Sequence, residues 1–168
     1  MKKPGIAVLV AIAAVVAMFG APALAGEKEK FKADLNGYQE TPQTLSTAAS
    51  GEFSAKVNKD ETELEYELSY SGIGEFGSTL FAHIHLGRPA LTGGVIAFLC
   101  GGGGKPACPG TSGMVTGTIT GADVIGPAAQ GIAAGEFAEL LRAMRAGATY
   151  VNVHSTGFPG GEIRGRVR

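Results

Sequence analysis

The 168-residue chain carries 14 Lys and Arg residues against 15 Asp and Glu residues, a formal net charge of −1 at pH 7. This balance excludes the basic footprint that a nucleic-acid-binding domain needs, so we expect no nucleic acid as a partner. The length and the 45% share of hydrophobic residues suffice for one domain with a core of its own.

The N-terminus has the parts of a secretory signal. A basic start at residues 2–3 precedes an uncharged apolar run over 6–19, and Ala-Leu-Ala at 23–25 fits a signal-peptidase site. The alternative is a membrane anchor, but the run is shorter than the ~20 residues that a spanning helix needs. We expect a signal peptide at 1–25, a single secreted or periplasmic domain at 26–168, and no membrane span after cleavage.

Apolar and polar residues alternate with a period of two through much of the chain. The alternation covers residues 31–35, 53–57 and 64–70, and it returns at 115–120. Such a pattern is typical of strands with one buried face and one wet face. Gly and Pro clusters between these segments complete the pattern of a mainly β, antiparallel fold.

The strand expected at 81–86 carries two of the three histidines of the chain, His83 and His85. Residues two apart in a strand share a face, so both imidazoles point the same way. If Ile84 and its apolar neighbours face the core, the two histidines look outward together with Phe81.

The continuous apolar run at 95–99 predicts a strand that is buried on both sides. Directly after it, Cys100 and Cys108 flank a glycine-rich loop. Export favours a disulfide between them, and the glycines let a short loop close without strain. The alternative is a thiolate pair that binds a metal, for which a tighter Cys-x-x-Cys spacing is usual.

One helix is expected at 136–146. Its apolar residues Phe137, Leu140, Leu141 and Met144 follow the spacing i, i+3, i+4, i+7 and form one stripe for packing. Gly147 stands where a left-handed residue ends a helix.

The last two strands are expected at 150–154 and 163–167. The Phe-Pro-Gly-Gly turn between them predicts an antiparallel hairpin. If the valines and Ile163 face the core, the opposite face gathers polar side chains. These are Asn152, His154, Glu162 and Arg164.

The three imidazoles of His83, His85 and His154 converge if their two strands pair. Neutral imidazole nitrogen suits copper and zinc, and three histidines with an open fourth position are typical of catalytic zinc sites. Glu162 would be either a fourth ligand or, like Asn152, a neighbouring group that orients an imidazole by a hydrogen bond. The sequence leaves two alternatives open: histidines that only bond to the backbone, and a Glu162 that only pairs with a basic group.

These segments, in this order, resemble the chordin-type (CHRD) domain family, in the form of a stand-alone bacterial secreted member. The resemblance implies an immunoglobulin-like or Greek-key β-sandwich similar to the copper/zinc superoxide dismutase barrel, with one packed α-helix. Such dismutases use more histidines than the three found here, so no two-metal site is implied. The blocks that carry the resemblance are residues 35–42, 49–51, 82–87, 93–96, 134–137, 147–154 and 159–165.

We therefore expect an exported, non-enzymatic CHRD-domain module that binds copper or zinc through His83, His85 and His154. An extracellular protein or matrix component is its expected partner. One alternative is a redox or hydrolytic metalloenzyme that uses the open coordination position. The other is an adhesion or matrix module in which the histidines are purely structural. The sequence contains no nucleophile elbow and no P-loop.

Overall fold

The computed structural model describes residues 1, 29–73 and 77–168, and this part of the chain forms eight strands and one α-helix. Three single-turn 3₁₀ helices lie between them, at Gly37–Gln39, Gly121–Asp123 and Ala128–Gln130. The strands and the helix are β1 (Lys30–Asn36), β2 (Ser50–Val57), β3 (Leu64–Ser71), β4 (Thr79–Leu86), β5 (Val95–Cys100), β6 (Gly113–Ile119), α1 (Phe137–Arg145), β7 (Thr149–Ser155) and β8 (Ile163–Arg166).

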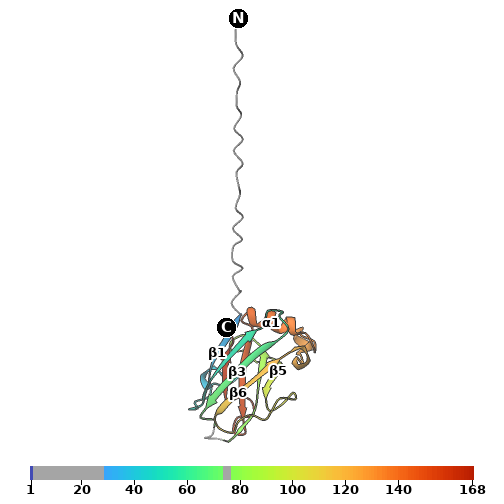
Figure 1. Ribbon diagram of the computed structural model, residues 1–168. Helices are drawn as coiled ribbons and strands as arrows, with labels where there is room; N and C mark the ends of the chain where they lie inside the picture. Colours follow the sequence, from blue (N-terminus) through green and yellow to red (C-terminus); the bar gives the residue numbers. More distant parts are fainter. Residues whose placement is uncertain (2–28, 74–76) are drawn as a thin grey trace.

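All eight strands belong to one antiparallel sheet in the order β5-β4-β7-β8-β1-β2-β3-β6. The two edge strands, β5 and β6, approach each other, so the sheet nearly closes into a barrel. Figure 1 shows α1 at one end of this barrel. The mainly β, antiparallel fold with one helix is therefore confirmed, as one continuous curved sheet.

The expected signal peptide falls almost wholly on residues 2–28, which lie outside the described residues. Among the residues that the structure describes, no helix is long and apolar enough to cross a membrane.

The alternating pattern places one face of each strand in the core. In β3, Leu64 and Leu68 are fully buried, whereas Glu65 and Glu67 are exposed. Burying a leucine side chain stabilises the fold by ~1.5–3 kcal/mol, so the period of two fixes which face turns inward. In the C-terminal hairpin, Val153 and Ile163 are likewise fully buried, as predicted.

The helix α1 buries the expected apolar stripe. It begins one residue later and ends one residue earlier than the expected range of 136–146. Gly147 has a φ of +61°, and its N–H donates to the carbonyl of Met144 at 2.9 Å. The N–H of Ala148 donates to the carbonyl of Ala143 at 3.0 Å. Together these two bonds form the glycine-ended motif that the sequence predicts after Ala146.

The strand β5 differs from the prediction that both its faces are buried. Ile96, Ala97 and Leu99 have no exposed surface, but Phe98 is only partly buried. The ring of Phe98 lies on the outer face of the sheet, where its centroid is 5.1 Å from that of His83. A continuous apolar run cannot reveal this, because it carries no alternation that would separate the two faces.

The predicted disulfide between Cys100 and Cys108 is present, and it closes a loop with a sequence separation of 8. We expect reduction to lower the free energy of unfolding by about 2–3 kcal/mol, because the bond restricts the unfolded chain. Urea unfolding of the oxidised protein and of the protein in excess reductant measures this difference. Equal free energies in the two states would contradict it.

Candidate metal centre

Strand pairing brings the three histidines together. In the antiparallel pair of β4 and β7, Phe81 stands opposite His154 and His83 stands opposite Asn152. The side chains of His83, His85 and His154 therefore share the outer face, opposite to the core-facing Ile84. The pairing of β4 with β5 is irregular on both sides of His83, as expected for bulges that re-aim side chains near a site.

The prediction that the three histidines share the outer face of the sheet is confirmed, but little of their surface reaches solvent. His83, His85 and His154 keep only 4%, 8% and 6% of their surface exposed. They do lie outside the barrel, but aromatic rings and loops cover them there. The covering rings belong to Phe81, Phe98 and Tyr150.

Backbone carbonyls hold two of the imidazoles in place. The Nδ1 atom of His85 lies 2.8 Å from the carbonyl oxygen of Gly93, and the Nδ1 atom of His154 lies 2.9 Å from that of Pro159. A carbonyl oxygen only accepts, so each Nδ1 carries the proton and donates. The Nε2 atom of each ring is then left with a free lone pair, the form in which a neutral histidine binds a metal.

Each histidine also has one buried ring nitrogen without a hydrogen-bond partner in the described part of the protein. These atoms are the Nδ1 of His83, the Nε2 of His85 and the Nε2 of His154. A buried polar atom without a partner costs ~1–3 kcal/mol, so three in one cluster are unusual unless another group satisfies them.

Burial keeps the imidazoles neutral. Desolvation, helped by the two neighbouring histidines, lowers the pKa of His83 to about 2. Desolvation also lowers the pKa of His154 to about 4, although the bond to Pro159 opposes it. The pKa of His85 is lowered by the same cause, against the bond to Gly93 and with the charge of Arg164 adding to the shift. Neutral rings are what a metal requires of its ligands.

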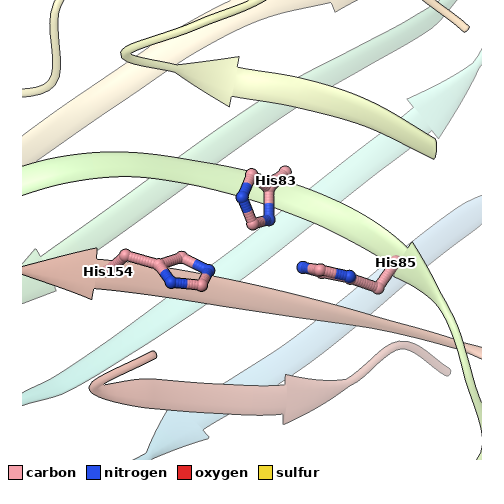
Figure 2. A group of neighbouring side chains, drawn as sticks. All are labelled: His83, His85 and His154. Atoms are coloured by element: carbon pink, nitrogen blue, oxygen red, sulfur yellow. The ribbon is translucent and has the colours of Figure 1, made fainter. Parts of the chain in front are cut away.

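The geometry fits a single metal ion. One ring nitrogen from each histidine lies within 4.8 Å of the others, and Figure 2 shows the three rings turned toward one another. Bonds of ~2.0–2.1 Å in a tetrahedral site place nitrogens roughly 3.4 Å apart, so small ring movements would close the cluster around an ion.

Asn152 and Glu162 lie beside the cluster, but their hydrogen bonds go elsewhere. The amide of Asn152 donates to the carboxylate of Glu40 and, at 3.1 Å, to the carbonyl of Ile163. Glu162 is fully buried, and it accepts a hydrogen bond from the hydroxyl of Thr47 at 2.9 Å. In this structure backbone carbonyls, and neither of these side chains, orient the imidazoles.

Sequence reasoning placed Arg164 on this face of the sheet, but it missed Glu40 and the contacts that join Arg164 and Tyr150 to the site. Burial raises the pKa of Glu40 to about 7, against the Asn152 bond and the charge of Arg164. Arg164 lies over Tyr150, with 3.5 Å between its guanidinium carbon and the ring centroid. Tyr150 in turn stacks on His85, with centroids 4.6 Å apart and planes at 3°. The alternation of side chains in β7 predicts the face on which Tyr150 lies, because Tyr150 is two residues from Asn152.

One of three comparisons with known proteins finds a match. The sequence profile of the CHRD domain matches residues 31–167. No curated protein and no solved structure matches the chain. The match covers all of the eight described strands except the first residue of β1, and it includes all three histidines, so the chain belongs to the CHRD domain family.

Proposed function

We propose that this chain is an exported, non-catalytic CHRD-domain module that binds copper or zinc through His83, His85 and His154. The observation that carries the proposal is the one buried, unpartnered ring nitrogen on each histidine. Copper and zinc both bind neutral imidazole, and such an ion would satisfy all three atoms at once.

Two features support a bound ion over histidines that are only structural. In a purely structural role, His85 and His154 would need only the hydrogen bonds from Nδ1 to the carbonyl groups of Gly93 and Pro159. Both rings also direct the other nitrogen, Nε2, into the cluster, where it has no hydrogen-bond partner among the described residues. Carbonyl acceptors on the far side of a histidine are also what orients metal-binding imidazoles in general.

Burial favours binding over catalysis. A catalytic ion needs an open position that substrate can reach, and each histidine has less than a tenth of its surface exposed. Sustained turnover by the metal-loaded protein would favour the metalloenzyme alternative instead. We propose an extracellular protein or matrix component as the partner of this module.

Metal analysis and thermal unfolding test the proposal. Protein purified without an affinity tag should contain copper or zinc, and removing the ion with a chelator should lower the melting temperature. An ion at 100 times its dissociation constant stabilises the folded state by about 2.7 kcal/mol. Absence of metal, together with a melting temperature that neither ion raises, would leave the histidines with a structural role.

Export has a separate test. The mature chain should begin at Gly26, because Ala23 and Ala25 supply the small residues that signal peptidase requires. Mass spectrometry of the protein from the periplasm or medium measures its N-terminus. An intact Met1 in that fraction would contradict cleavage.

A further inference from the structure

The aromatic rings of Phe81 and Phe98 pack around the histidine cluster. The centroid of Phe81 lies 5.3 Å from that of His83 and 4.7 Å from that of His154. Phe98 stands edge-on to His83 at 5.1 Å. The surroundings therefore offer faces and edges of apolar rings, where a water or a carboxylate would otherwise complete a coordination sphere.

The cluster consists of three histidines. Within residues 29–73 and 77–168, no Asp, Glu or Cys joins His83, His85 and His154 in one metal-binding group. Zinc(II) is almost always four-coordinate, and copper(II) prefers four or more ligands in a tetragonal arrangement. Copper(I) has a filled d shell and accepts three neutral nitrogens in a trigonal arrangement without a further ligand.

A buried positive charge lies behind the cluster. The guanidinium of Arg164 covers one face of Tyr150 while His85 stacks on the same ring. Arg164 donates to carbonyl oxygens of Arg88 and Leu91 at 3.1 and 2.7 Å, and to the hydroxyl of Thr41. These hydrogen-bond acceptors are uncharged, and the carboxyl group that interacts with the guanidinium, that of Glu40, has its pKa raised to about 7 by burial, so it offsets the positive charge only in part near pH 7.

This charge disfavours a doubly charged ion more than a singly charged one. The charge of Arg164 already acts on His85. For two charges separated by ~10 Å in a medium of effective dielectric constant ~20, each additional positive charge on the ion lowers its affinity roughly tenfold. The apolar rings add to this preference, because desolvating a divalent ion costs more than desolvating a monovalent one.

We infer that the His83, His85 and His154 cluster selects copper(I) over zinc(II) and copper(II). The selection comes from three neutral nitrogen donors, an apolar aromatic enclosure and the nearby guanidinium of Arg164. The inference rests on the proposed function of this chain as a metal-binding module, and it names the ion that the module carries.

Competition titrations test the selection. The purified, untagged protein is titrated without oxygen against the copper(I) chelator bicinchoninate in excess ascorbate, and separately with zinc(II) and copper(II) against chelators of known affinity. A thiol assay must show that Cys100 and Cys108 stay oxidised, because free thiolates would themselves bind copper(I). We expect copper(I) to bind at least roughly 100-fold more tightly than either divalent ion.

The outcomes separate the inference from the proposed function. Zinc(II) or copper(II) bound as tightly as copper(I) would overturn the selection and leave a metal-binding module. Failure to bind any of the three ions would overturn both the selection of copper(I) and the proposed metal-binding function.

A charge variant tests the contribution of Arg164. Arg164→Gln should lower the ratio of the affinity for copper(I) to the affinity for a divalent ion by roughly tenfold. Arg142→Gln, on the exposed face of α1, should leave this ratio unchanged. An unchanged ratio in folded Arg164→Gln would overturn the electrostatic part of the argument. If that variant fails to fold, the ratio in the wild-type protein decides the inference alone.

Discussion

His154→Asn should weaken metal binding by at least roughly 100-fold, because two imidazoles are left to hold the ion. The asparagine amide stands where the Nδ1–H of the imidazole stands, so it can still donate to the carbonyl of Pro159. The substitution removes only the ring edge with the unpartnered Nε2. His85→Asn applies the same design to the bond with Gly93. Chelator competition measures the affinity of each variant.

The stability of the metal-free variants is the control. Because the bond to the backbone carbonyl is kept, the free energy of unfolding should stay within about 2 kcal/mol of the wild-type value. A folded His154→Asn protein that binds copper as tightly as the wild type would show that His154 is not a ligand.

Acid should destabilise the metal-free protein over the range in which free histidine takes up protons. The three histidines have pKa values below the ordinary 6.5 in the folded state, with His83 at about 2 and His154 at about 4. The unfolded chain therefore binds up to three more protons than the folded chain as the pH falls below about 6.5. Their contribution is fully present above that pH and is lost as the pH falls toward the folded values.

Glu40 acts in the opposite direction. Its folded pKa of about 7 lies above the ordinary 4.5, so between these values the folded chain holds a proton that the unfolded chain has released. From His83 and His154 alone the net difference is about one proton, and His85 adds to it in the same direction. We expect stability to fall by at least roughly 1–2 kcal/mol between about pH 7 and pH 5. Urea unfolding across this range measures the slope.

A single substitution checks the origin of this slope. His83→Phe keeps an aromatic ring between Phe81 and Phe98 and removes one titrating group. The slope should then fall by about 1.4 kcal/mol per pH unit, the effect of one proton. A metal-free stability that does not change between about pH 7 and pH 5 would contradict neutral, buried histidines.

Local patterns were sufficient to predict the strands and the side of the sheet that carries the histidines. A strand has a period of two, so an apolar Ile84 between His83 and His85 settles the face on which both imidazoles lie. The helix was predictable for a similar reason, since its apolar stripe and Gly147 agree.

The environment of the histidines was not predictable in this way. The alternation of side chains along a strand shows which face a side chain lies on, but it does not show which groups cover that face. The covering groups come from distant segments, including Phe98 on β5 and the carbonyl groups of Gly93 and Pro159 in loops. A backbone carbonyl also has no residue type, so no sequence motif marks it.

The position of the C-terminal hairpin in the sheet has a consequence for folding. Strands β7 and β8 lie between β4 and β1, so hydrogen bonding along the sheet joins the pair β5-β4 to the group β1-β2-β3-β6 only through them. During synthesis from the N-terminus, the strands of both groups emerge before β7 and β8. The two groups stay unconnected until these last strands emerge. The pairing of β4 with β7 spans a long stretch of sequence, which makes it a slow, late step. The ligand on β7, His154, arrives in that step, so the three histidines can hold an ion only after β4 and β7 have paired.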